Sequence, residues 1–313
     1  LSDFGSWSVK EKQQGRIPNG PNYKVDHDGS VKPSQLEIVV EPMAGDQTVI
    51  NGLNAIADMV WTHNCQVNET CGYHVHVDAR DFSWADIQKL MFLWFKLERG
   101  DNLWKLAGRR PNEFCRSWQD WWGGSNQALA SIDLKTFKSQ IVKSLYNVDV
   151  NKYKELIDKV INSRDYKNEC KVHKQICLES GKDYTKPSII PWVSPLDTHT
   201  KLKANRGWNR AVKSRYLDLN IHSWIFRGTV EYRIGNGTVD VDDIRMWPLW
   251  CLWLTEIVNR TNFRIILEYT RNNTDPINQI IKDKGFRVPG FMGESIYPIA
   301  PYLLNWIEKK VNT

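Results

Sequence analysis

The sequence has no pair of cysteines spaced as Cys-x-x-Cys, although six cysteines occur along its 313 residues. This absence excludes a zinc knuckle and a thioredoxin-like redox motif, because both need two thiols within one short turn. Single, scattered cysteines are typical of buried, reduced thiols. We expect that state for Cys65, Cys71, Cys115, Cys170, Cys177 and Cys251.

Two phosphate-binding signatures are also missing. The chain contains neither the P-loop pattern nor Gly-x-Gly-x-x-Gly, so P-loop and Rossmann chemistry are not expected. No run of about 18 apolar residues occurs, and residues 1–22 are polar instead of basic and then apolar. These patterns predict neither a membrane-spanning segment nor a secretory signal, and we expect a cytoplasmic protein without a membrane partner.

The composition that is present is that of an ordinary globular protein, with 41% hydrophobic and 25% charged residues. A chain of this length can bury a sizeable core, and most of its 15 tryptophans are expected there. The net charge of +6 favours an anionic partner. Because the excess is small for this length, the phosphates of a nucleotide account for it, and a nucleic acid partner is not expected.

Residue patterns along the chain predict an α+β fold. Short β-like runs at 23–25 and 35–40 flank the turn-forming residues 27–30 and predict a hairpin, and further strands are expected at 71–78, 215–221 and 229–234. Helices are expected from a cap at Asp46 or Thr48 to about residue 64, from Ser83 to Gly100, from about Val241 onward, and over 277–284 and 302–311. Lysine-rich helical segments from 101 to 205 predict a helical insertion within a single domain of residues 1–313.

Two histidines lie two positions apart in the strand predicted at 71–78. Side chains alternate faces along a strand, so His74 and His76 point the same way, while Tyr73, Val75 and Val77 point the other way. The arrangement is either a row of ligands or two ordinary histidines on a half-buried strand.

Carboxylates and an arginine follow the same rule on two other predicted strands. Glu37 faces away from Leu36 and Ile38, as an exposed edge residue or an inward ligand, and Glu231 shares a face with Arg233, as a surface ion pair or as part of a site. Three strands that each present polar side chains from one face favour a site. Carboxylate and imidazole ligands suit Mg²⁺ or Mn²⁺, and arginines nearby would bind phosphoryl oxygens.

Several runs of the sequence resemble the putative amidoligase family, a branch of the glutamine synthetase-like carboxylate–amine ligases. They occur in the family's order between about residues 23 and 262, and the blocks at 71–77 and 229–238 also resemble blocks of glutamine synthetase itself. The matching runs are Asp28–Ser30, Leu36–Pro42, Cys71–Val77, Arg215–Asn220 and Thr229–Thr238.

The resemblance implies a glutamine synthetase-like antiparallel sheet, flanked by helices, that cradles ATP and two divalent cations, Mg²⁺ or Mn²⁺. It also implies phosphoryl transfer to a carboxylate, followed by attack of an amine on the acyl phosphate. By motif, Glu37 would bind one cation, His74 and Glu231 the other, His76 would approach an ATP phosphate, and Arg215 and Arg233 would be the catalytic residues that hold phosphate or acyl phosphate.

The first strand of the resembled family usually carries Phe-Gly-x-Glu-x-Glu, whereas here Phe4-Gly5 is followed by Ser6-Trp7. Either Glu41 or Asp78 stands in for the missing glutamates, or the first strand is lacking, or the site is degenerate. A degenerate site would leave a structural, virion-associated role, since relatives of this kind are often encoded by bacteriophages. A metal-dependent hydrolase is a second alternative, because His-x-His also occurs where a metal activates water. Assembly as a homo-oligomer or in a virion is compatible with these alternatives.

Overall fold

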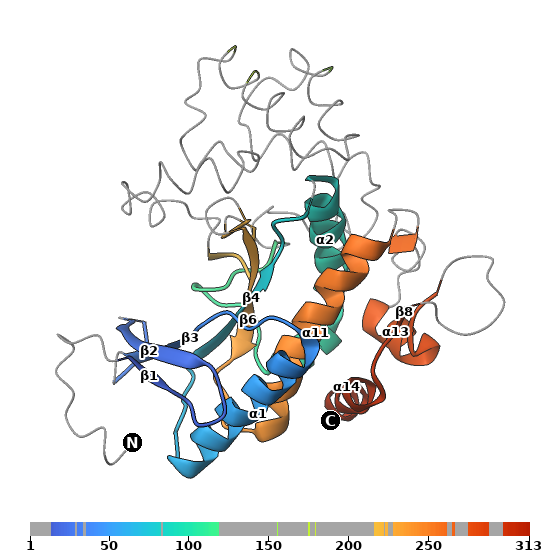
Figure 1. Cartoon of the computed structure of the whole chain (residues 1–313). Helices are drawn as coiled ribbons and strands as arrows, with labels where there is room; N and C mark the ends of the chain where they lie inside the picture. The colour runs from blue at the N-terminus through green and yellow to red at the C-terminus, as the bar shows by residue number, and fades with distance from the viewer. Residues whose placement is uncertain are drawn as a thin grey trace. The chain divides into compact units, whose positions relative to one another are not determined.

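The computed structural model describes residues 14–118 except 29, 34–35 and 83, single residues 155, 175 and 179, and residues 216–221, 223–224, 228–261, 265–266, 275–287 and 297–313. Two compact units are distinguished, and each is described by itself. Unit 1 comprises Leu1–Tyr73 with Gly235–Trp250, and unit 2 comprises His74–Ile234 with Cys251–Thr313. The mixture of helices and antiparallel strands confirms the predicted α+β class (Figure 1).

The sheet of unit 1 is an antiparallel meander of β1 (Gln14–Arg16), β2 (Asn22–His27) and β3 (Leu36–Val40). The predicted hairpin is confirmed, with Tyr23 opposite Val40 and His27 opposite Leu36. The turn after β2 is held by the Asp28 carboxylate, whose Oδ1 accepts hydrogen bonds from the backbone N and the Oγ of Ser30, at 2.9 and 2.6 Å. Such a local side-chain bond is why Asp favours turns.

Helix α1 (Asp46–Thr62) follows β3 in the chain and ends where the sequence predicted, before His63. Its start differs from the prediction. The N-cap is Gly45, at φ 85°, and no side chain bonds to the first turn, so neither Asp46 nor Thr48 is the cap. A positive φ is accessible to glycine without steric cost, which explains why Gly45 and not a polar residue precedes the helix.

Helix α11 (Val241–Arg260) begins at the predicted place, and the Asp240 carboxylate caps it by accepting the backbone N–H of Asp243 at 3.0 Å. The helix contains Pro248, which has no N–H to donate to the carbonyl of Ile244. In unit 1 the hydroxyl of Tyr73 donates to that carbonyl at 3.0 Å. Tyr73 thus replaces the hydrogen bond that the proline removes.

A second three-stranded sheet has the order β4 (Gly72–Asp78), β6 (Thr229–Asn236), β5 (Leu219–Asn220), so β6 is its central strand. The strand predicted at 215–221 is shorter in the structure, where β5 contains only Leu219 and Asn220, paired with Tyr232 and Glu231 of β6. The residues just before β5 bond on their other side to Arg116, whose backbone N–H donates to the Tyr216 carbonyl and whose carbonyl accepts from Asp218. Arg215 lies outside the described residues.

The expectation that one sheet carries all the candidate strands is wrong for the described strands. Glu37 belongs to β3 and therefore to the sheet of unit 1, whereas the two histidines and Glu231 belong to the β4-β6-β5 sheet. The physical reason is local. The run Leu36–Val40 pairs with the strand that precedes it in the chain and forms its own meander.

The core of unit 2 lies on one face of β6, where Val230, Tyr232 and Ile234 are fully buried. Helix α2 (Trp84–Leu97) and the second half of α11 lie along this part of the sheet (Figure 1). The ring of Trp94 meets that of Tyr232 edge-on at 5.2 Å, and the Tyr232 hydroxyl bonds to the Thr255 hydroxyl at 2.7 Å. The buried Lys89 ammonium donates to the carbonyls of Val258 and Thr261 at the end of α11, as a cation at a helix C-terminus should.

The remaining described elements also belong to unit 2. They are α3 (Asp101–Ala107), α13 (Pro276–Asp283), the paired strands β7 (Gly285–Phe286) and β8 (Tyr297–Pro298), and α14 (Pro301–Asn312). The last two predicted helices are confirmed within one or two residues. Of the predicted insertion at 101–205, only α3, residues 108–118 and three single residues are described, and the rest lies outside the described residues, as does the predicted cap Ser83.

Candidate functional site

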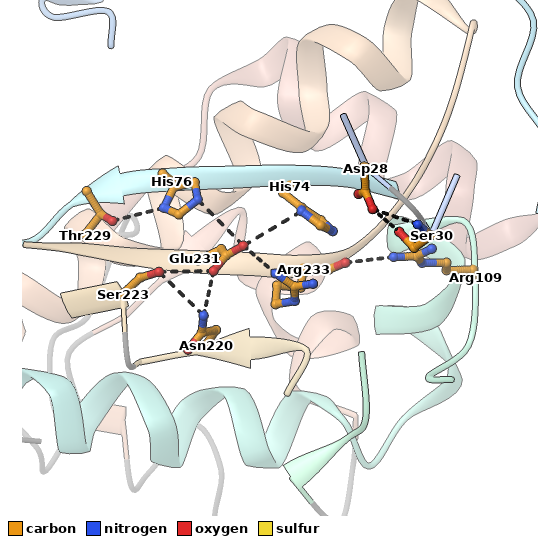
Figure 2. Close-up of polar contacts among 10 residues, drawn as sticks. All are labelled: Asp28, Ser30, His74, His76, Arg109, Asn220, Ser223, Thr229, Glu231 and Arg233. Carbon is orange, nitrogen blue, oxygen red and sulfur yellow. Dashed lines mark hydrogen bonds and ion pairs between the residues drawn. The ribbon is translucent and has the colours of Figure 1, made fainter. Parts of the chain in front are cut away.

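The candidate site is formed by the polar side chains of two neighbouring strands, β4 and β6. Hydrogen bonds from Ala79 to Gly228 and from Gly237 to Cys71, one near each end, show that these strands run antiparallel. Because alternate residues share a face, β4 presents His74 and His76 to the same side on which β6 presents Glu231 and Arg233 (Figure 2).

Glu231 lies at the centre of this group, with its side chain 7% exposed. Its Oε1 accepts a hydrogen bond from Nη1 of Arg233 at 2.7 Å and lies 3.8 Å from Nδ1 of His74 and 3.6 Å from Nε2 of His76. The sequence left open a surface ion pair between Glu231 and Arg233. The burial of both side chains shows that the pair is internal.

The second oxygen of Glu231 is held by two neutral donors. Oε2 accepts Nδ2 of Asn220 at 2.6 Å and the hydroxyl of Ser223 at 3.0 Å. Asn220 stands directly opposite Glu231 in the β5–β6 register, and Ser223 follows β5 closely in the chain. Both residues are buried.

A count of lone pairs shows what remains of this carboxylate for other ligands. A carboxylate offers about four lone-pair positions. Two on Oε2 are used by Asn220 and Ser223, and one on Oε1 is used by Arg233. The position that is left is on Oε1, the oxygen that both imidazoles approach. The described contacts therefore leave one acceptor position, on the side of the histidines.

The electrostatic environment fixes the charge states of this group. Burial raises the pKa of Glu231, but Arg233 and the two histidines outweigh it and bring the pKa to about 2. Burial lowers the pKa of His74 to about 4, and Arg233 adds to that shift while Glu231 opposes it. At neutral pH the site therefore holds an ionised carboxylate next to a neutral imidazole, whose ring nitrogen can act as a ligand.

Arg233 is held from both sides. Its guanidinium pairs with Glu231 and lies over the ring of Tyr216, with 5.9 Å between its Cζ and the ring centroid. The guanidinium of Arg109 donates through Nη2 to the carbonyl of Arg233 at 2.8 Å and through Nε to that of Ile234 at 2.9 Å. These bonds fix the end of β6 on which Arg233 stands.

His76 has a hydroxyl partner on its other ring nitrogen. Its Nδ1 lies 3.0 Å from Oγ1 of Thr229, and its Nε2 faces Glu231 (Figure 2). A partner on one ring nitrogen orients the imidazole.

No described contact joins the other residues singled out from the sequence to this group. Glu37 stands opposite Asp26 in the β2–β3 register of unit 1, and Arg215 lies outside the described residues. The two candidates for the missing first-strand glutamates have partners of their own. Both oxygens of Glu41 accept from Asn22 at 2.9 Å, and Asp78, at the end of β4, pairs with Arg80.

The donor chemistry at His74 and Glu231 fits a divalent cation, since an ionised carboxylate and a neutral imidazole are both metal ligands. The set is small. Within the part of the chain that the structure describes, no three His, Cys, Asp or Glu residues form a group that could hold a metal ion. A cation here would therefore be bound by these two protein ligands together with water or substrate oxygens, which is how Mg²⁺ is commonly held.

Sequence reasoning missed Arg109, Asn220, Ser223 and Thr229 as members of the candidate site. Asn220 carried a signal, since it lies in the Arg215–Asn220 run and on a strand expected to pair with 229–234. Arg109 and Ser223 carried none, because each lies outside the predicted strands, at a place that only the folded chain defines.

Comparison with known proteins identifies the family. The family model described as putative amidoligase enzyme matches residues 7–176 and 193–255. No curated protein and no solved structure matches the chain. Among the described residues, no helix has both the length and the apolarity needed to cross a lipid bilayer. The matched residues cover most of the chain, which therefore belongs to the putative amidoligase enzyme family.

Proposed function

We propose that the protein is an ATP-dependent carboxylate–amine ligase that forms an amide or isopeptide bond through an acyl phosphate. The observation that carries the proposal is the single acceptor position of the ionised Glu231, which faces the neutral imidazole of His74 beside the guanidinium of Arg233. A site of this composition suits polyphosphate chemistry, which depends on positioning and on neutralising negative charge.

The reaction has two steps. A carboxylate oxygen of one substrate attacks the γ-phosphorus of ATP, ADP leaves, and a mixed anhydride of the carboxylate and phosphate forms. The amine nitrogen of the second substrate then attacks the carbonyl carbon, the carbon–oxygen bond to phosphate breaks, and the amine loses a proton. In the first step negative charge spreads over the transferred phosphoryl group, and cationic groups placed there lower the barrier.

Each side chain of the site has a role in this proposal. His74 and Glu231 hold a Mg²⁺ or Mn²⁺ ion, which when bound neutralises phosphate charge. His76 approaches an ATP phosphate, with its ring oriented by Thr229. Arg233 holds phosphate or acyl phosphate with a forked guanidinium, and Arg109 keeps Arg233 in place through the backbone.

Two residues enter the proposal from their sequence motifs alone. Glu37 is assigned to a second cation because its run Leu36–Pro42 resembles the family's block, and Arg215 is assigned to phosphate for the same reason. Their substitution tests those assignments separately from the site built by β4 and β6.

The direct test is release of ADP from Mg²⁺-ATP in the presence of a panel of carboxylates and amines. Glu231→Gln removes the charge of the carboxylate, and Arg233→Lys replaces the fork by a point charge, so both should abolish release. The matched controls are Glu256→Gln and Arg260→Lys, which alter an exposed ion pair on α11 and should leave release unchanged.

Thermal melting gives a readout that does not need the correct substrates. Mg²⁺-ATP at a hundredfold excess over its dissociation constant should stabilise the fold by about 2.7 kcal/mol. Failure of millimolar Mg²⁺-ATP to shift the melting curve, together with absence of ADP release, would contradict the ligase and favour a structural role. ADP release that survives Glu231→Gln unchanged would show that the chemistry lies elsewhere.

A further inference from the structure

The two donors on Oε2 of Glu231 do more than satisfy a buried carboxylate. Asn220 and Ser223 reach the same oxygen, at 2.6 and 3.0 Å, and both belong to β5 or the turn after it (Figure 2). Nδ2 of Asn220 also lies 3.5 Å from the hydroxyl of Ser223, so the two side chains form one small network around Oε2.

The network is rigid because all three of its members are buried. Asn220 is fixed by the β5–β6 pairing, and the Asn220 amide can turn only its Nδ2 toward a carboxylate, since the amide oxygen does not donate. Oε2 is therefore held away from any cation that binds between Oε1 and His74.

Divalent cations differ in how they use a carboxylate. Ca²⁺ takes six to eight oxygens and often binds both oxygens of one carboxylate, whereas Mg²⁺ requires near-octahedral geometry and takes one oxygen from each carboxylate. A glutamate that has one oxygen held by other donors can therefore bind Mg²⁺ well and Ca²⁺ poorly.

We propose that Asn220 and Ser223 set the cation selectivity of the site, by holding Oε2 so that Glu231 binds through Oε1 alone and Mg²⁺ or Mn²⁺ is preferred over Ca²⁺. This inference rests on the proposed metal-dependent function. Asn220 and Ser223 are positioning residues, since they act through Glu231 and not on substrate.

The role makes a prediction that a purely structural role does not. Loss of a merely structural hydrogen bond weakens every cation to a similar extent. Release of Oε2 instead allows Glu231 to bind with both oxygens, so Ca²⁺ gains relative to Mg²⁺. The measured quantity is the ratio of the Ca²⁺ to the Mg²⁺ dissociation constant.

The experiment uses the full chain and Mn²⁺ as a probe, since the electron paramagnetic resonance signal of free Mn²⁺ reports its binding, and Ca²⁺ and Mg²⁺ are added as competitors. It compares the wild type with Ser223→Ala, Asn220→Ala and the double variant. Asn102→Ala is the matched control, because Asn102 is also buried and donates its amide to a side-chain oxygen, that of Asn278, at 2.9 Å in another part of unit 2.

The ratio should fall in the double variant, and it should fall less in each single variant. It should not change in Asn102→Ala. Ser223→Ala removes only a hydroxyl, so it serves as the test if Asn220→Ala does not fold. Its circular dichroism spectrum and melting curve show whether Ser223→Ala itself is folded.

The outcomes separate the two proposals. A wild-type protein that binds no Mn²⁺ at millimolar concentration overturns both the metal site and this inference. A wild-type protein that binds Mn²⁺, with a selectivity ratio unchanged in folded Ser223→Ala and in the double variant, overturns this inference and leaves the metal site standing. The same result in Ser223→Ala alone overturns it if the double variant does not fold.

Discussion

The buried pair of Glu231 and Arg233 should be strongly coupled in stability, and a double-mutant cycle can measure the coupling. Their 2.7 Å contact is almost out of solvent, with the two side chains 7% and 12% exposed. Removing one partner of such a pair usually costs about 3–5 kcal/mol, because the other charge stays buried without compensation.

The neighbouring side chains decide whether Glu231→Gln or Arg233→Met lowers the free energy of unfolding more. In Glu231→Gln the Arg233 guanidinium loses its carboxylate partner and stays nearly buried, 12% exposed, beside an uncharged amide. We expect a loss of about 3 kcal/mol or more in the free energy of unfolding. In Arg233→Met the carboxylate keeps its two neutral donors, and the loss should be smaller.

The double variant Glu231→Gln with Arg233→Met should be more stable than the sum of the two losses implies, with a coupling energy of about 1.5–3 kcal/mol. Urea unfolding at pH 7, followed by circular dichroism, supplies the four free energies. The matched cycle on the exposed pair of Glu256 and Arg260 should give less than about 1 kcal/mol. A coupling at Glu231 and Arg233 no larger than that of this control pair would refute the reasoning.

Three further predictions follow from other contacts. The His74 imidazole should titrate near pH 4, as followed by NMR with the signal assigned from His74→Gln. Arg109→Met should raise the pKa of His74, because Arg109 contributes to lowering it. A midpoint near 6.5 in the wild type would contradict this prediction. The unfolded chain takes up this proton at higher pH than the folded one, so the free energy of unfolding should fall by up to about 3 kcal/mol as the pH drops from 6.5 to 4, which urea unfolding with and without His74→Gln checks. Tyr73→Phe should cost about 1 kcal/mol by leaving the Ile244 carbonyl unsatisfied, and the added change Pro248→Ala should restore that loss in thermal melts, whereas equal losses in both backgrounds would show that the contact is unimportant.

The periodicity of the sequence was sufficient to place the central part of the site. The alternation in 229–234 put Glu231 and Arg233 on one face and Val230 and Tyr232 on the other, and the structure has the second pair in the core. The same alternation put His74 and His76 together, and both face Glu231. Strand parity is a local property, so a single sequence contains it; the metal and phosphate roles of these residues stay predictions.

Features that depend on tertiary contacts could not be found this way. The segment before Asn220 forms backbone hydrogen bonds with Arg116, a residue about a hundred positions earlier in the chain. The Glu37 strand pairs within its own meander, which strand parity alone does not reveal. The hydroxyl of Tyr73 reaches a carbonyl 171 positions away, so its role is not evident from its neighbours. In each case the deciding partner is distant in sequence, and spacing rules do not reach it.

Side chains of β6 alternate between the core and the candidate site, so one strand register places both sets of residues. Thr229 and Glu231 contact the histidines from one side of the strand, and Val230, Tyr232 and Ile234 fill the core. Insertion or deletion of one residue within 229–234 would exchange the two sets, placing Glu231 and Arg233 in the core and the tyrosine in the site. This part of the chain can therefore change by substitution far more readily than by a change in length, and a new specificity must come from the loops and strands around β6, not from a shift of β6 itself.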